Sequence, residues 1–249
     1  MSFDIAAYLE RIDLADRPPV TLTGLRTLLA AQLSCIAFEN LETMLGDLPD
    51  MSAAGIWNKL VAGGRGGTAL QLNSLLGSAL AALGFRARPI MGRIGSEMPT
   101  AKSHLAWIVF VEGRNWLVDA GLGDYGPFTP IMESSRPQAS SGAMFRVIAE
   151  ARDENTLQRK AGESWTNLYS YRRSSIKQVG DEGAKASWSP DIRSSYSRDL
   201  IVSLHRPNGR LSIVNSFAKT EADMGMRVLE FSTAEAFART IRGTFMLNY

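Results

Sequence analysis

The sequence predicts an α+β fold, on three observations. Apolar residues recur at helical spacing through the first third of the 249 residues, and strand-like segments follow Gly84. A β-hairpin signal and one capped helix come last. Helices first, strands next and a small mixed α/β end favour α+β over a doubly wound sheet.

Four helices are predicted before Gly84. The second is expected to begin after Thr21 or Thr23 and the third after Ser52, because such side chains cap helix N-termini. Gly84 suits the left-handed C-cap of the fourth. The apolar faces are Phe3, Ile5, Ala6, Leu9 and Ile12; then Leu22, Leu25, Leu28, Leu29 and Leu33; then Ala53, Ile56, Trp57 and Leu60; and finally Ala69, Leu72, Leu75, Leu76, Ala79, Leu80 and Leu83.

Strands are predicted in the middle of the chain. The strongest candidate is His104–Glu112, joined by a turn at residues 113–115 to a second strand at Trp116–Ala120. Further candidates are Phe85–Ile94, Phe145–Ala149 and Trp165–Tyr171. An antiparallel sheet, with a barrel as one possible arrangement, fits these signals.

The last part of the chain is predicted as a loop or interdomain crossing at Val179–Arg198, followed by a hairpin and a helix. Pro207-Asn208-Gly209 is the expected turn between strands at 200–204 and 211–214. Ser232 and Glu235 form a capping-box pattern for a helix that ends near Gly243.

The composition is that of an ordinary globular protein. Hydrophobic residues make up 45% and charged residues 21%, and the net charge is only +2, so charge gives no case for binding nucleic acid or an anionic membrane. The single cysteine, Cys35, cannot form an internal disulfide. We expect it to lie in the second helix, near Phe38, as a packing residue. No signal peptide or apolar run of about 18 residues is visible, so we expect a cytoplasmic protein.

The first segment that carries chemistry is Arg65-Gly-Gly-Thr-Ala-Leu-Gln-Leu-Asn73. Its glycines allow a close backbone approach, and they lead into a helix N-terminus whose dipole favours negative charge. A cysteine at position 69 would therefore have a lowered pKa. An ordinary glycine loop before an ordinary helix explains the same spacing.

The second segment begins at His104 and ends at Asp119-Ala-Gly-Leu-Gly123. His and Asp on paired strands can meet, and the carboxylate would fix the tautomer of the imidazole and stabilise its charged form. That is a base with its orienting group, without a nucleophile in this segment. A lone strand His with a turn Asp is the alternative. His205, the other histidine, is expected at the surface beside the hairpin turn. With one Cys and two scattered His, no metal site is predicted.

Together the two segments resemble the arylamine N-acetyltransferase family, including its relatives that form macrolactams. The family pattern R-G-G-x-C-x-E-x-N, then a strand His, then W-L-V-D-V-G-F-G, matches here in order and spacing. Ile36-Ala-Phe-Glu-Asn-Leu41 is similar to the family's I-P-F-E-N-L. The likeness runs from about residue 5 to residue 245.

The resemblance implies three domains with a thiol-protease-like core. These are a helical bundle (1–84) carrying the nucleophile loop, a β-barrel (85–190) carrying His and Asp, and an α/β lid (191–249). It implies catalytic positions at Ala69, His104 and Asp119. Implied substrate contacts are Arg65, Gly66, Gly67, Thr68, Phe38, Leu122 and Gly123, and implied structural supports are Glu39, Gln71 and Asn73. Arg65 and Glu39 would form a buried pair, expected to be bidentate.

The resemblance also implies the reaction and its partners. A thiolate would take an acyl group from a thioester, either CoA or a carrier-protein thioester, and pass it to a small-molecule amine. No resident cofactor is implied. An acyl carrier protein is a possible partner, whereas nucleic acid and membrane are not expected.

Five departures from the family pattern decide how far the resemblance carries. Ala69 stands at the nucleophile position, and a methyl group cannot form a thioester. Gln71 replaces a Glu, Thr68 an aromatic residue, Gln32 a His, and Leu122 a Phe near the acyl pocket.

Three hypotheses remain open. In the first, Ala69 is an inactivating replacement in an N-acyltransferase or amide synthase. In the second, the chain naturally lacks the cysteine, and His104 with Asp119 acts as a general base for a non-covalent cyclisation or condensation. In the third, the chain is a non-catalytic small-molecule-binding protein.

Overall fold

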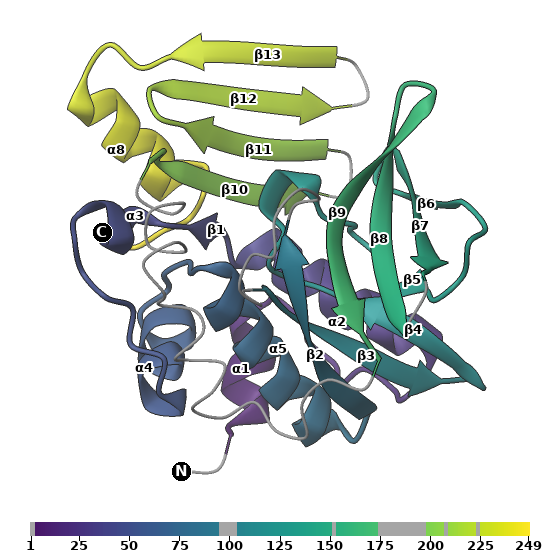
Figure 1. Ribbon diagram of the computed structural model, residues 1–249. Coiled ribbons are helices and arrows are strands. Elements are labelled where there is room, and N and C mark those ends of the chain that lie inside the picture. Colours follow the sequence, from purple (N-terminus) through teal and green to yellow (C-terminus); the bar gives the residue numbers. More distant parts are fainter. Residues whose placement is uncertain (1–2, 95–103, 151–152, 174–197, 207–208, 223–224) are drawn as a thin grey trace.

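The structure, a computed structural model, describes residues 3–94, 104–150, 153–173, 198–206, 209–222 and 225–249. Helices, an eight-stranded antiparallel sheet and a five-stranded antiparallel sheet follow one another, which confirms the α+β class (Figure 1). Within the described residues, no helix is both long and apolar enough to cross a membrane.

The four predicted helices are confirmed, and their caps explain their bounds. Asp4 caps the helix at Ile5–Arg11, Thr21 the helix at Leu22–Cys35 and Ser52 the helix at Ala53–Trp57, each by accepting from backbone N–H groups. Gly84 ends the helix at Ala69–Leu83 with a φ of 88°. The helices are α1 (Ile5–Arg11), α2 (Leu22–Cys35), a short α3 (Leu41–Met44), α4 (Ala53–Trp57), which continues as a π-helical turn η1 (Asn58–Ala62), and α5 (Ala69–Leu83).

The eight-stranded sheet is nearly closed into a barrel. Its edges approach one another where Val147 N donates to Ser134 O at 2.9 Å, and where the Gln138 amide bonds the backbone of Met132 at 2.8 and 3.0 Å. In sheet order its strands are β5 (Ile131–Met132), β4 (Arg114–Val118), β3 (His104–Val111), β2 (Arg86–Ile94), β9 (Ser164–Arg172), β8 (Glu154–Ala161), β7 (Ala143–Ala149) and β6 (Gln138–Ser140).

Close packing fixes α5 against β3. A Cβ on Gly77 would lie 1.9 Å from Trp107 Cζ2, so only glycine lets the indole lie against the helix. Trp107 Nε1 also donates to Asn73 O at 2.8 Å. The helix that begins at position 69 is thus tied to the strand that begins at His104.

The second sheet joins distant parts of the chain. Its order is β1 (Phe38–Glu39), β10 (Ile201–Arg206), β11 (Gly209–Val214), β12 (Phe217–Ala222) and β13 (Gly225–Glu230). The helix α8 (Ala234–Gly243) lies beside it (Figure 1). Ile241 and Phe245 pack with Val202 and Ile213 in one buried cluster. Strand β1 thereby makes the Phe38–Glu39 segment the edge of the C-terminal sheet.

Three predictions of local structure need correction. The N-cap of α8 is Thr233, whose hydroxyl accepts from Ala236 N, so the Ser232–Glu235 capping box does not form. The β3–β4 turn is the pair Glu112-Gly113, both with positive φ, and not residues 113–115. Six strands are not predicted by the sequence: β6, β8, β12 and β13 alternate weakly, and β1 and β5 have only two residues each.

The strands predicted at 85–94, 104–112, 116–120, 145–149, 165–171, 200–204 and 211–214 are confirmed with small shifts of their ends. β10 and β11 pair as a hairpin, although Pro207 and Asn208 lie outside the described residues, as does nearly all of 179–198. The domain boundaries at 84/85 and 190/191 stay predictions.

Candidate active site

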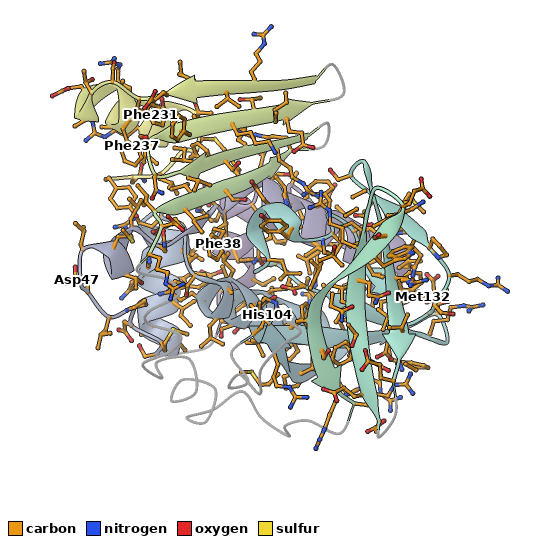
Figure 2. All side chains as sticks on the ribbon, turned by 45° about the horizontal axis from the view of Figure 1, so that its top comes forward. Phe38, Asp47, His104, Met132, Phe231 and Phe237 are labelled. Atoms are coloured by element: carbon orange, nitrogen blue, oxygen red, sulfur yellow. The ribbon has the colours of Figure 1, made fainter. Side chains whose placement is uncertain are left out.

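The site centres on a buried pair of side chains from neighbouring strands. His104 opens β3, and Asp119 directly follows β4, its antiparallel partner. His104 Nε2 and Asp119 Oδ2 lie 2.6 Å apart, and neither side chain is exposed to solvent. Figure 2 places His104 deep inside the molecule.

Asp119 is held as a carboxylate by three donors. Its Oδ1 accepts from Asn73 Nδ2 at 2.9 Å and from Gly121 N at 2.8 Å, and its Oδ2 faces His104. Burial by itself would raise the pKa of Asp119, but the neighbouring His104 and these hydrogen bonds lower it below its ordinary value. The side chain is therefore charged at neutral pH.

An ionised Asp119 sets the tautomer of His104. Because the carboxylate can only accept, the neutral imidazole of His104 carries its proton on Nε2 and its lone pair on Nδ1. Nδ1 is buried and has no hydrogen-bond partner among the described residues. The imidazole thus presents one free basic nitrogen inside the protein, held by an orienting carboxylate.

Position 69 lies beside this pair. Ala69 is buried at the first turn of α5, and Asn73, one turn later, carries the amide that bonds Asp119. A Cβ on Gly121 would lie 2.8 Å from both Ala69 Cα and Ala69 O, so the loop after Asp119 packs directly on the start of the helix. Asn73 Oδ1 also accepts from Ala120 N at 2.9 Å and fixes the same loop.

The helix start is closed by a capping box. Gln71 Oε1 accepts from Thr68 N at 3.1 Å, and both residues are buried. An amide at position 71 can fill this role as well as a carboxylate, so the Glu-to-Gln departure keeps the cap.

The glycine loop pairs with β1. Gly67 N donates to Ala37 O at 3.1 Å, and Glu39 N donates to Gly67 O at 2.9 Å. A Cβ on Gly66 would lie 2.5 Å from Ala37 O, so this close approach requires glycine. The two glycines therefore attach the loop before position 69 to the Phe38–Glu39 segment.

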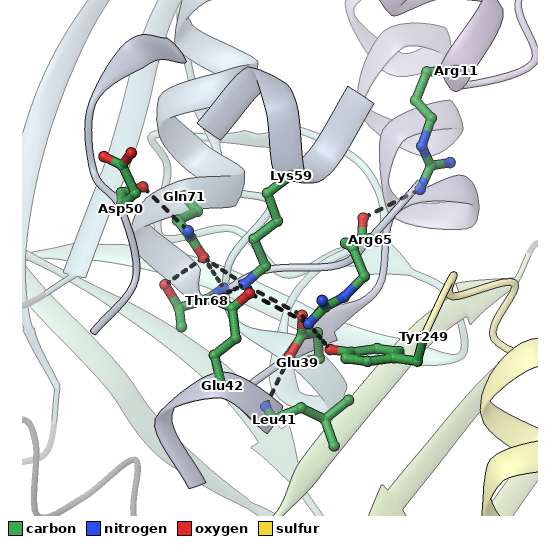
Figure 3. A network of polar contacts seen from close by, with 10 residues as sticks. All are labelled: Arg11, Glu39, Leu41, Glu42, Asp50, Lys59, Arg65, Thr68, Gln71 and Tyr249. Carbon is green, nitrogen blue, oxygen red and sulfur yellow. Dashed lines mark hydrogen bonds and ion pairs between the residues drawn. The ribbon is translucent and has the colours of Figure 1, made fainter. Parts of the chain in front are cut away.

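Arg65 belongs to a charged group that we call the Arg65 cluster: Glu39, Glu42, Lys59, Arg65 and Tyr249 (Figure 3). The predicted bidentate geometry is wrong. A single nitrogen, Arg65 Nη2, contacts Glu39 Oε1 at 3.4 Å. Both side chains divide their contacts among several partners. Glu39 also faces Lys59 Nζ at 3.4 Å and accepts from Leu41 N at 2.8 Å. Arg65 also contacts Glu42 and Tyr249.

The other predicted contact residues lie where the three parts meet. Phe38 pairs with Ser203 of β10, and a Cβ on Gly123 would lie 3.7 Å from the Phe38 ring and 3.6 Å from Ser203 Oγ. Leu122 packs against the barrel core. Phe38 and Gly123 thus lie together at the edge of the C-terminal sheet.

Tyr169 was not foreseen as part of the site. Its ring centroid lies 4.8 Å from that of His104, and burial together with the charge of Asp119 raises the pKa of the Tyr169 phenol. A Cβ on Gly92, the strand partner of His104, would lie 2.7 Å from this ring. No motif marked Tyr169, because its strand β9 pairs with β2 from far along the chain, and local sequence does not show such a pairing.

The expectation for His205 is wrong. The side chain is 3% exposed, because β10 packs onto the loop that follows Asp119 and the Phe128 ring covers the imidazole at 5.8 Å. Burial and the neighbouring Arg210 lower the pKa of His205 to about 4. A hairpin signal in the sequence does not reveal which side of the strand is covered.

Among the described residues, the site brings together an imidazole, a carboxylate that bonds it and a helix N-terminus, with a methyl group at position 69. Cys35 is partly buried and packs against the helical core, as expected. Within the described ranges, no three His, Cys, Asp or Glu side chains form a group that could hold a metal ion.

Known proteins resemble this chain in sequence. A profile of the N-acetyltransferase family matches residues 21–249. Arylamine N-acetyltransferase of Mycolicibacterium smegmatis is 34% identical over 180 residues, covering 69% of this chain and 65% of that enzyme.

Solved structures agree. The Salmonella typhimurium arylamine N-acetyltransferase superposes with a TM-score of 0.90 at 23% identity, covering 98% of this chain and 91% of that one, which shows the fold. The Mycobacterium marinum enzyme in complex with CoA superposes with a TM-score of 0.88 at 29% identity, covering 98% and 93%.

Proposed function

Because the chain belongs to the arylamine N-acetyltransferase family, we propose that its buried site is the acyl-transfer centre of an N-acyltransferase in which Ala69 occupies the position of the nucleophile. One observation carries the proposal: the His104–Asp119 pair is complete, hydrogen-bonded through Asn73 to the helix that begins at position 69. Family members transfer acetyl groups from acetyl-CoA to amines.

The residues suit a two-step transfer once a thiol stands at position 69. The thiol proton passes to His104 Nδ1, the sulfur attacks the thioester carbonyl, and the carbon–sulfur bond to CoA breaks as His104 returns the proton to the leaving thiolate. An amine then attacks the acyl-enzyme, gives its proton to His104, and releases the protein sulfur. The methyl group of Ala69 supports neither step.

The experiment is the substitution Ala69→Cys followed by acetyl-CoA and intact mass spectrometry. We expect a gain of one acetyl group on residue 69, and transfer of that group to an added arylamine. The parent chain retains Cys35 and serves as the control for acylation elsewhere. Ala69→Cys combined with His104→Ala should acylate at least about a hundredfold more slowly. A folded Ala69→Cys protein that accepts no acyl group from any thioester would end the proposal.

The acyl donor and the acceptor can also be named by their chemistry. We propose CoA thioesters as donors and a small-molecule amine as acceptor, with a carrier-protein thioester as the competing donor. Parallel reactions of the Ala69→Cys protein with acetyl-CoA and with an acylated carrier protein decide between them. A preference for the carrier protein would support an amide synthase, in which the amine and the acyl group belong to one substrate.

A second candidate function rests on the free His104 Nδ1 in the chain as it stands. A chain that naturally lacks the cysteine would use this nitrogen as a general base for a non-covalent condensation or cyclisation. Turnover by the unsubstituted protein, abolished by His104→Ala, would establish this function. Binding of an arylamine without turnover in either form would instead indicate a binding protein.

A further inference from the structure

A second part of the molecule reaches the loop before position 69: the segment Phe245–Tyr249, which follows α8. Phe245 and Leu247 are buried in the core of the C-terminal sheet. Asn248 N and Nδ2 donate to Gly64 O at 3.4 Å and to Gly63 O at 3.3 Å. The segment is thus fixed at one end by the sheet and bonded to the glycine-rich loop at the other.

Tyr249 completes this contact at Arg65. The Arg65 guanidinium carbon lies 3.4 Å from the centroid of the Tyr249 ring, and Arg65 Nη2 donates to the Tyr249 hydroxyl (Figure 3). Burial and the nearby Glu39 raise the pKa of the Tyr249 phenol, so it remains protonated. Arg242 Nε in α8 donates to Tyr249 O at 3.0 Å and holds the residue in place.

The need for such a support follows from the charges around Arg65. Glu39 is fully buried, and its carboxylate contacts Arg65 through one nitrogen of the guanidinium, as well as Lys59 and Leu41 N. The guanidinium is partly exposed and Glu42 is a second acceptor for it at 3.4 Å. A ring stacked on the guanidinium restricts the side chain to one of several available orientations.

The orientation of Arg65 matters because only three residues separate it from position 69. Gly66 and Gly67, the next two residues, are pressed against Ala37 and Glu39. On the far side, Arg11 Nη2 donates to Arg65 O at 3.3 Å. Movement of Arg65 would therefore be passed to the Glu39 carboxylate and to the backbone that leads into α5.

We propose that Tyr249 is a positioning residue for the acyl-transfer site, which holds Arg65 and, through the glycine loop, sets the reactivity of a nucleophile at position 69. The role rests on the proposed function, since it assumes that position 69 carries the nucleophile. In this role, Tyr249 of the C-terminal segment supports a site whose other residues lie mainly in the helices and the barrel.

The test uses the full chain with Cys35→Ala and Ala69→Cys, so that residue 69 carries the only thiol. Alkylation by iodoacetamide is followed against pH in this parent and in three further variants. Tyr249→Ala removes the ring, Tyr249→Phe keeps the ring and removes the hydroxyl, and Met246→Ala alters an exposed side chain of the same segment. Thermal unfolding of each variant is measured alongside.

We expect Tyr249→Ala to slow alkylation at neutral pH by about three- to tenfold and to move the midpoint of the pH profile toward that of an ordinary thiol. Tyr249→Phe should fall between Tyr249→Ala and the parent, and Met246→Ala should match the parent. Identical profiles for Tyr249→Ala and Met246→Ala would overturn the proposal, even if Tyr249→Ala lowers the melting temperature. Failure of iodoacetamide to reach residue 69 in any variant would overturn it as well.

This readout separates the two proposals because alkylation needs no acyl donor. A profile that depends on Tyr249, in a protein that accepts no acyl group, would refute acyl transfer and leave the positioning role standing. Acylation of residue 69, with an alkylation profile that Tyr249→Ala leaves unchanged, would support acyl transfer and refute the positioning role.

Discussion

Replacing Asn73 with alanine should damage both the stability of the protein and the support of its candidate base. Asn73 makes two buried side-chain hydrogen bonds: Nδ2 donates to Asp119 Oδ1 at 2.9 Å, and Oδ1 accepts from Ala120 N at 2.9 Å. The side chain is fully buried, so water does not replace these bonds at no cost. Asp119 keeps its contacts with His104 and Gly121 N, whereas Ala120 N loses this partner.

The magnitude follows from these two bonds. A hydrogen bond to an ionised carboxylate contributes about 1.5–3 kcal/mol, and an unsatisfied buried N–H costs about 1–3 kcal/mol. Their sum predicts a loss of about 2.5–6 kcal/mol in the free energy of unfolding. For a chain of this size that corresponds to a fall of roughly 5–24 °C in the melting temperature. Loss of the Asn73 bond should also raise the pKa of Asp119, because that bond helps to lower it.

Urea unfolding at neutral pH, followed by circular dichroism, measures the loss. Asn58→Ala is the matched control, because it removes the same atoms from an exposed residue of η1. We expect the control to stay within about 0.5 kcal/mol of the parent. If Asn73→Ala costs less than about 1 kcal/mol, or no more than the control, the asparagine does not hold the Asp119 loop in place.

Three further predictions concern packing and pH. Gly77→Ala places a Cβ 1.9 Å from Trp107 Cζ2 and should cost about 1–3 kcal/mol in urea unfolding; a neutral result would show that the indole can move aside. His205 is buried with a pKa lowered to about 4, so the unfolded chain binds the extra proton and stability should fall as pH drops from about 6.5 to 4, by about 3 kcal/mol. His205→Leu should flatten that part of the pH–stability curve, and an unchanged slope would assign it to other groups. The pKa of Asp119 is lowered in the fold, so its carboxylate stabilises the folded protein at pH values above its ordinary pKa of about 4. This stabilisation is lost as the pH falls through the pKa of the folded state. Asp119→Asn should remove that acid-dependent loss, measured as melting temperature against pH.

Much of the fold could be predicted because local signals agreed with it. Caps at Thr21 and Ser52 and the glycine at 84 sit where the helices begin and end. Polar strands such as β8 and β12 could not be predicted, because their stability comes from pairing within a sheet and not from an apolar pattern of their own.

The candidate site was only partly visible in the sequence. His104 and Asp119 could be paired because they lie on strands joined by a short turn. Tyr169 and Tyr249 could not be found, since they reach the site from β9 and from the segment after α8, far along the chain. The same limit explains His205, whose burial depends on a loop from the barrel.

The sequence by itself determined what chemistry position 69 excludes. A methyl group at Ala69 cannot attack a thioester in any fold, whereas the surrounding glycines, His104 and Asp119 are the residues that such an attack would need. Only the tertiary structure decided which atoms are available for it. Asp119 fixes His104 Nε2 and leaves Nδ1 free, the loop after Asp119 packs on the start of α5 at position 69, and the C-terminal segment contacts the glycine-rich loop before it. Long-range packing makes these contacts, and no local pattern of residues specifies them.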